Sequence, residues 1–409
     1  DYESHELIAI STGGGMIEVI RVDGASVHIA GDYFETLIYC KNPDPILDFI
    51  KASLTYDELH LHTGMKNFVQ ISSQVPCNDI LLQELKSMAG VEAVKVLNPV
   101  LPVLARKNMQ VPFITCREML EYNKGKNGAL WELAVAYESE RGNITHAEVF
   151  EKMRRIVQIM GNAIATGLKG TTYHDRILGA QSLQFKEKLA NQRLVGGDAN
   201  NTVIMYVSAI MEVKSSMGVI VAAPTAGSCG GLPGAIFGIA HSMGLQEDDI
   251  VKAMLSAGLI GVFIAAHATF AAEVGGCMAE TGSGGGMAAA AIVEMKGGNL
   301  DQSLTAASLA LQNSLGIICD PIGNRVEAPC LGRNVMAATN AISSANMALS
   351  DYVQLIPLDE VIETMKLVGD QIHHTLRCTN LGGLSITKAA KNIESMLEEN
   401  EQKVFFKNC

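Results

Sequence analysis

Three cysteines lie in glycine- and proline-rich segments of the chain. Cys277 stands in GGCMAETGSGGGMAAAA, and Cys319 and Cys330 stand in IICDPIGNRVEAPCLGRN. Thiolates select zinc, copper(I) or iron–sulfur clusters, and three of them without a fourth nearby suit a cluster with one open iron better than a closed structural site. Their long spacing matches no short ligand template, and free cysteines are often simply buried. Spacing alone therefore leaves metal ligation and plain burial equally supported.

A second candidate is the loop APTAGSCGGLPG, which runs from Ala223 to Gly234 ahead of an expected helix. Backbone N–H groups at such a junction can bind an anion. Thr225 and Ser228 would add hydroxyl donors to a substrate carboxylate, and Gly227 lies between them. The alternative is a tight turn between helices that requires small residues. Cys229 in this loop is not assigned as a ligand.

Arg333 and Asn334 follow Cys330 on the first turn of an expected helix. An arginine can hold a substrate carboxylate through two parallel hydrogen bonds, which makes Arg333 a catalytic candidate. Asn334, the next residue, is a second catalytic candidate. Arg333 could instead form an ion pair with Glu327 or Asp320.

Glu280 stands three residues after Cys277 and is the third catalytic candidate. It would act as a base or would cap the adjacent glycine turn. His267 lies in an apolar stretch and is interpreted as a hydrogen-bonded core histidine.

The elements that must position these residues are mostly helical. Thr115 and Glu118 form a capping box for a helix towards Tyr137, and Asn143 or Thr145 begins the next helix. Further helices are predicted over residues 178–192, 201–217, 234–243, 247–272, 286–295, 301–316, 333–349 and 358–373. Apolar residues make up 48% of the 409, aromatic residues only 5%, and there are 39 glycines. This composition favours closely packed helices, in a large all-α domain around a buried central helix.

The residues before this domain predict strands instead. Residues 5–31 read as short strands with a hairpin turn at Asp23 and Gly24. Residues 34–104 follow the order β-α-β-β-α-β, which is the ferredoxin-like unit. Asn42 or Asp44 is expected to cap the first helix and Asn78 the second. This module resembles an ACT domain, which implies amino-acid binding or pairing with another copy. The fold class is therefore multidomain α+β, with the large all-α domain following.

Several motifs together resemble the alpha part of the iron–sulfur-dependent L-serine dehydratases. They are the Ala223–Gly234 loop, the segment around Cys277 and the segment from Cys319 to Asn334. GGDA at residues 196–199 and LGGL at residues 381–384 are weaker matches. The motifs occur in the family's order and extend over residues 114–391, which is most of the chain.

The resemblance implies an L-serine ammonia-lyase that forms pyruvate and ammonia. It implies a 4Fe–4S cluster held by Cys277, Cys319 and Cys330, whose open iron acts as a Lewis acid on the substrate hydroxyl. Pyridoxal phosphate is disfavoured because lysines are scarce near the glycine loops. The alternatives are a related threonine or cysteine lyase, and a non-catalytic amino-acid sensor with a degenerate site.

The resemblance also predicts how the chain is divided. Residues 1–33 would be a strand-rich remnant of the family's beta part, 34–105 an ACT-like domain, 114–393 the alpha domain and 394–409 a C-terminal tail. The SSHT-type and GHGT-like segments of the beta part are missing, so a partner chain would supply them or the sequence is truncated. The chain begins at Asp1 without an initiator Met, which predicts a processed product or a fragment. Cys409 would cap the open iron, as a tail cysteine does in some relatives.

Met278 and Thr281 depart from the residues that relatives commonly carry at these places. The departures would alter substrate preference or the surroundings of the cluster.

Net charge and cysteine content limit which binding partners and which cell compartment are expected. A formal net charge of −12 argues against binding to nucleic acid or to an anionic membrane surface. Nine cysteines without a dense framework, and no visible secretory leader, predict a reducing cytoplasm. Residues 253–272 carry no Asp, Glu, Lys or Arg, but their glycines, alanines and His267 favour a buried helix over a membrane span. We expect a homo-oligomer.

Overall fold

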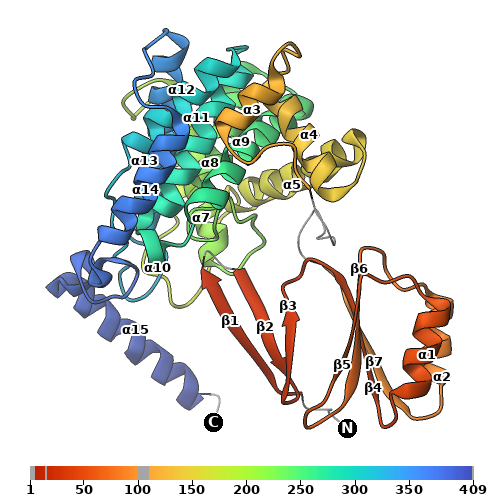
Figure 1. Cartoon of the computed structure of the whole chain (residues 1–409). Helices are drawn as coiled ribbons and strands as arrows, with labels where there is room; N and C mark the ends of the chain where they lie inside the picture. Colours follow the sequence, from red (N-terminus) through yellow and green to blue (C-terminus); the bar gives the residue numbers. More distant parts are fainter. Residues whose placement is uncertain (1–4, 14–15, 100–109, 408–409) are drawn as a thin grey trace. The chain divides into compact units, whose positions relative to one another are not determined.

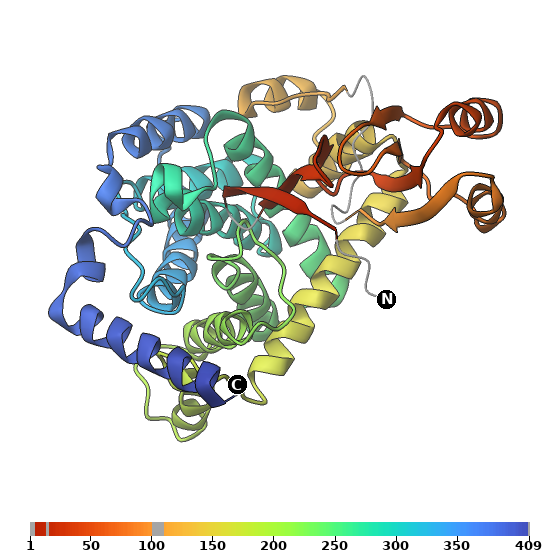
Figure 2. The same ribbon diagram turned by 90° about the horizontal axis from the view of Figure 1, so that it is seen from below.

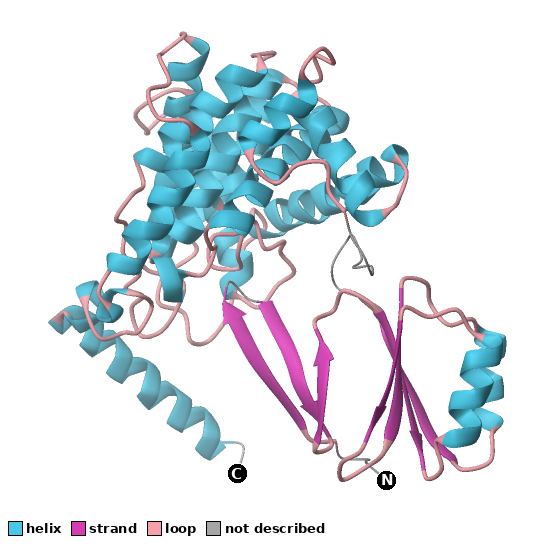
Figure 3. Ribbon diagram, viewed as in Figure 1, coloured by secondary structure: helices cyan, strands magenta, loops and turns pink. Residues whose placement is uncertain are grey.

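The structure is a computed structural model that describes residues 5–13, 16–99 and 110–407. The chain forms two compact units, one holding most residues up to Val111 and the other most residues from Pro112 onwards. Strands belong to the first unit and the second is built of helices (Figures 1 and 3). The predicted α+β fold class, with a small ferredoxin-like part before a large helical domain, is confirmed.

The first unit begins with a three-stranded sheet in the order β1-β2-β3, made of Leu7–Gly13, Met16–Val22 and Ala25–Ile29. The predicted hairpin turn is confirmed, because β2 and β3 pair antiparallel with Val22 opposite Ala25. Asp23 and Gly24 both have positive φ, at 47° and 80°. Two such residues form the turn whose twist suits a two-residue hairpin.

A four-stranded antiparallel sheet follows, in the order β5-β6-β4-β7. Its elements are β4 (Phe34–Cys40), α1 (Asp44–Ser53), β5 (Glu58–His62), β6 (Phe68–Ser73), α2 (Asp79–Ser87) and β7 (Val91–Leu97). This is the ferredoxin-like order. Asn78 caps α2 as predicted, since its side chain accepts from the Leu81 N–H at 2.9 Å. Asp44 is the first residue of α1 and not its cap; the Asn42 side chain accepts from the Asp44 N–H.

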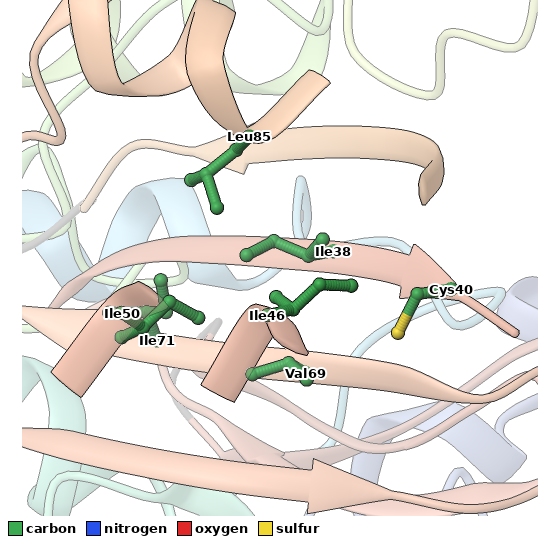
Figure 4. Close-up of a cluster of buried hydrophobic side chains, with 7 residues drawn as sticks. All are labelled: Ile38, Cys40, Ile46, Ile50, Val69, Ile71 and Leu85. Atoms are coloured by element: carbon green, nitrogen blue, oxygen red, sulfur yellow. The ribbon is translucent and has the colours of Figure 1, made fainter. Parts of the chain in front are cut away.

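Strand β4 is buried on both faces. One face packs against α1 and α2 in the cluster of Figure 4, which contains Ile38, Cys40, Ile46, Ile50, Val69, Ile71 and Leu85. The other face carries Leu37 and Tyr39, which pack with Phe68 of β6 and with residues of the hairpin. Successive strand residues point to opposite faces, so the apolar run Leu37–Cys40 supplies buried side chains to both faces.

Helices make up most of the chain after Pro112. In chain order they are α3 (Cys116–Asn123), α4 (Leu130–Gly142), α5 (His146–Gly167), α6 (Gln181–Ala190), α7 (Asp198–Ser215), α8 (Gly231–Met243), α9 (Glu247–His267), α10 (Ala272–Gly275), the π-helical turn η1 (Met278–Gly282), α11 (Ser283–Met295), α12 (Leu300–Gln312), α13 (Cys330–Leu349), α14 (Leu358–Gln371), the 3-10 turns η2 (His374–Leu376) and η3 (Gly383–Ile386), and α15 (Lys388–Lys407).

The capping boxes are confirmed at Thr115 before α3 and at Thr145 before α5. The single helix predicted from Thr115 towards Tyr137 is wrong, because the chain forms α3 and α4 with a break between them. Gly125 in this break has a φ of +76°, a conformation that a helix does not contain.

Helix α11 is the most completely enclosed helix of the site region. Every residue from Ser283 to Val293 is buried, and α11 packs against α8, α9, α12 and α13. Helix α9 is long and apolar enough to cross a membrane, with a mean hydropathy of 1.8 over its most apolar window. Within the structure 61% of that window is buried, as expected for a core helix.

Small residues let the helices approach closely. A Cβ atom placed on Gly234 or Gly238 of α8 would lie 2.4 Å from a valine side chain of α7. Helix α5, yellow in Figure 2, runs along a flank of this helical unit and packs on α7 and α9. The predicted small-residue packing is therefore observed at these contacts.

Candidate functional site

The segment before Cys277 is shaped by a glycine. Gly276 has a φ of +70°, and a Cβ atom there would lie 2.7 Å from the carbonyl oxygen of Ile317. The N–H of Met278 donates to the same carbonyl at 3.0 Å. This close approach brings Cys277 next to the segment that carries Cys319. Cys277 immediately precedes the π-helical turn η1, a feature that is frequent at functional sites.

Cys319 and Cys330 reach the same region from loops at helix ends. The Cys319 N–H donates to the Leu376 carbonyl at 2.8 Å, and Cys330 is the first residue of α13. The Sγ atoms of Cys277 and Cys319 and a carboxylate oxygen of Glu280 all lie within 4.8 Å of one another. Cys330 lies outside that group. All three cysteines are buried, with at most 5% of their surface exposed.

Neighbouring groups shift the ionisation of these thiols in opposite directions. A hydrogen bond from the Cys319 thiol, aided by the positive charge of Arg333, lowers the pKa of Cys277. Burial, together with the charge of Cys277, raises the pKa of Cys330 to about 12. Metals bind the thiolate form, and of these three cysteines Cys277 is the one whose pKa is lowered.

Arg333 connects this thiol to the C-terminal LGGL segment. Its guanidinium donates to the Cys277 Sγ at 3.5 Å and forms an ion pair with Asp320. The second oxygen of Asp320 accepts from the Leu384 N–H at 2.7 Å. Gly383 fits against this carboxylate, since a Cβ atom there would lie 2.4 Å from the Asp320 oxygen. The alternative considered for Arg333, an ion pair with Asp320, is thus present.

Asn334 is fully buried, and its side chain forms three hydrogen bonds to backbone groups. Its Oδ1 accepts from the Gly231 N–H at 2.9 Å, and its Nδ2 donates to the carbonyls of Gly227 and Cys330. It therefore connects the start of α8, the glycine loop and the start of α13. It also occupies the Gly231 N–H, one of the amides at the helix start that we expected to bind an anion.

Glu280 lies between the thiols and the glycine loop. The Thr225 hydroxyl donates to its Oε1 at 2.8 Å, and a Cβ atom on Gly227 would lie 2.9 Å from the same oxygen. Burial raises the pKa of Glu280 to about 7. Ser228 is linked to Glu280 through Thr225, because the Ser228 N–H donates to the Thr225 hydroxyl at 3.1 Å. A carboxyl group of this kind can exchange a proton near neutral pH.

Two groups at this site were not found from the sequence. The thiol of Cys378 is hydrogen-bonded to that of Cys319, and its nearness in sequence to LGGL is the only signal that could have indicated it. Lys214 of α7 donates to the Val326 carbonyl, and burial lowers its pKa.

His267 is hydrogen-bonded to the Ile114 carbonyl at 3.0 Å, in keeping with a core histidine. Cys409 lies outside the described residues.

The donor set fits a thiolate-bound metal group. Buried thiols that converge from three segments, with an arginine donating to one sulfur, are the surroundings in which iron–sulfur clusters are held and tuned. Fold and site together thus define a helical domain with a thiol-rich centre and an adjoining, partly buried carboxyl group.

Comparison with known proteins identifies the family. Residues 125–385 match the family described as serine dehydratase alpha chain. The "Probable L-serine dehydratase, alpha chain" of Bacillus subtilis is 35% identical over 285 residues, 70% of this chain and 95% of that protein. The "L-serine dehydratase, alpha chain" of Peptoniphilus asaccharolyticus is 35% identical over 68% of this chain and 96% of its own. "L-serine dehydratase 1" of Escherichia coli is 30% identical over 67% of this chain and 62% of its own.

This chain belongs to the serine dehydratase alpha-chain family. The recognition made from its motifs is therefore confirmed.

Proposed function

We propose that this chain is the alpha portion of an L-serine ammonia-lyase, which converts L-serine to pyruvate and ammonia. Family membership supports the substrate, since the similar proteins are named L-serine dehydratases. The observation that carries the proposal is the convergence of Cys277, Cys319 and Glu280 within 4.8 Å. It places candidate metal ligands beside a group able to move a proton.

The proposed cofactor is a 4Fe–4S cluster held by Cys277, Cys319 and Cys330. When bound, such a cluster supplies a Lewis acid for the hydroxyl group that leaves as water. The three thiols come from two segments that are distant along the chain, and all three are buried, which supports this assignment.

The protein's own residues then have distinct roles. Glu280 exchanges a proton with the substrate, because it combines a partly buried carboxyl group with a pKa near neutrality. Thr225 holds that carboxyl group in place through its 2.8 Å hydrogen bond, and Gly227 leaves open the space beside it. Ser228 supports Thr225.

Arg333 and Asn334 act through other groups. Arg333 stabilises the Cys277 thiolate through its guanidinium, and Asn334 fixes the start of α13 against the glycine loop. We accordingly propose a positioning role for Asn334 in place of direct contact with the substrate.

The remaining assignments are also proposals. A partner chain would supply the SSHT-type and GHGT-like segments, and the naming of relatives as alpha chains supports this. The ferredoxin-like unit would be ACT-like, with the predicted limits 34–105, between a 1–33 remnant and the alpha domain 114–393. The sheet order supports that assignment. We propose a cytoplasmic homo-oligomer, with residues 394–409 as its tail.

The test is anaerobic reconstitution with iron and sulfide, alone and with a beta chain of a relative. We expect a brown protein that releases pyruvate from L-serine, and Cys277→Ser should lose both colour and activity. Cys77→Ser, in the other unit, is the matched control and should keep both. L-threonine and L-cysteine as substrates test the related lyases. A colourless, inactive protein that binds an amino acid would instead support the sensor.

A further inference from the structure

Cys378 lies against the cysteine site although it is remote from it in sequence. Its N–H donates to the Cys319 carbonyl at 2.9 Å, next to the 2.8 Å bond from the Cys319 N–H to the Leu376 carbonyl. These bonds join the two segments side by side, as a parallel bridge between Cys319 and Arg377. Cys378 also packs against the buried cluster of Ala272, Cys277 and Cys319.

The thiols themselves are in contact. The Cys319 thiol is hydrogen-bonded to the thiols of both Cys277 and Cys378. Cys319 is therefore the middle member of a chain of three sulfurs, and Cys330 is close enough to Cys277 to feel its charge. Four cysteines contribute to this one region.

The backbone at Cys378 is unusual. Its φ is +61°, in the left-handed region that residues other than glycine seldom adopt. The neighbouring Arg377 secures the segment, since its guanidinium and Nε donate to the carbonyls of Ile372, Val274 and Asp370. A strained backbone held in place by its surroundings is typical of functional positions.

These observations point to a role for Cys378. We infer that Cys378 is a fourth thiol ligand of the cluster. In the resting protein it would bind the iron that has no ligand from Cys277, Cys319 or Cys330. This rests on the proposed iron–sulfur function. Four thiolates are the usual complement of a 4Fe–4S cluster, and a fourth thiol ligand would protect the cluster against loss of one iron.

The test measures iron retention and not turnover alone. Wild-type protein, Cys378→Ser and Cys409→Ser are reconstituted anaerobically, and iron per chain is followed during mild oxidation, with electron paramagnetic resonance to detect a three-iron cluster. We expect Cys378→Ser to lose one iron about ten-fold faster than the wild type, the scale on which single supporting groups alter metal affinity. Cys409→Ser should behave as the wild type.

A second variant guards against misfolding. Cys378→Gly suits a positive φ and should give the same three-iron signal, with an unchanged circular dichroism spectrum. Equal iron loss in wild type and both Cys378 variants overturns the inference and leaves the proposed lyase standing. Faster loss only in Cys409→Ser assigns the fourth ligand to the tail and also overturns it. If no protein binds iron, the proposed function itself fails.

Discussion

Glu35 of the ferredoxin-like unit and Glu280 of the helical unit are both shielded from solvent, Glu35 fully and Glu280 in part, and they differ in what surrounds them. Burial raises the pKa of both Glu35 in the ferredoxin-like unit and Glu280 in the helical unit. Glu35 accepts hydrogen bonds from the side chains of Gln70 and Ser72, at 3.1 and 2.8 Å, within a sheet. Glu280 accepts from Thr225 and lies within 4.8 Å of two thiols.

The cysteines show the same contrast. Cys40 belongs to the apolar core of the ferredoxin-like unit, and Cys77 lies partly buried at its edge. In the helical unit, Cys277 and Cys319 are in hydrogen-bonding contact. Burial is thus common to both units, and it is convergence with other reactive groups that distinguishes a candidate site from a core.

The strongest test of this contrast is the removal of the central thiol. Cys319→Ser should abolish stable iron binding, because Cys319 contacts two other thiols of the site. Iron and sulfide content after anaerobic reconstitution measure the effect. Cys77→Ser in the first unit should retain its full iron content, and equal loss in both variants would remove the distinction between the units.

Exchanging the two carboxyl groups for amides is the next test. Glu280→Gln should lower kcat by about 10³-fold, within the usual range for loss of a general acid or base. Glu35→Gln should leave kcat unchanged. Both variants should be compared at equal iron loading, since a loss explained by missing iron would argue against proton transfer by Glu280.

A smaller effect is expected at the glycine loop. Gly227→Ala places a Cβ atom 2.9 Å from the Glu280 oxygen and displaces that carboxyl group. A shift of this kind should lower kcat by about 10²-fold. Gly332→Ala on α13 is the control, because nothing lies within 4 Å of the added atom. It should keep its activity and gain up to about 1 kcal/mol of stability from the better helix propensity of alanine.

The smallest effect concerns the pH dependence of stability. The pKa of Glu35 is raised in the folded protein above its ordinary value of 4.5. Glu35 therefore contributes stability at pH values below 4.5, and this contribution is lost as the pH rises through the folded-state pKa. Glu35→Gln removes the cost of ionising a buried group. In urea unfolding, the free energy of unfolding of the variant relative to that of the wild type should therefore increase as the pH is raised from acidic to neutral. A pH-independent difference would contradict this account.

Local patterns predicted much of the fold. The capping boxes at Thr115 and Thr145, the Asn78 cap and the Asp23–Gly24 turn all depend on neighbouring residues, so the sequence alone is sufficient to find them. Where tertiary contacts override local preference, the sequence misleads. It predicts that residues 283–285 precede the helix, because glycines disfavour helices. They form the start of α11, which packs closely against α13: at Gly285 a Cβ atom would lie 3.2 Å from the Ala337 carbonyl oxygen, so the contact requires the glycine that local preference disfavours.

What the sequence determined by itself was most of the reactive residues, though not Cys378 or Lys214, and the family motifs that contain them. Tertiary structure alone decided which of those residues meet. It engaged Asn334 with backbone groups, paired Arg333 with Asp320 and brought Cys378 to Cys319. The reason is physical: side chains converge through the packing of helices and loops distant along the chain, and no local spacing encodes that geometry.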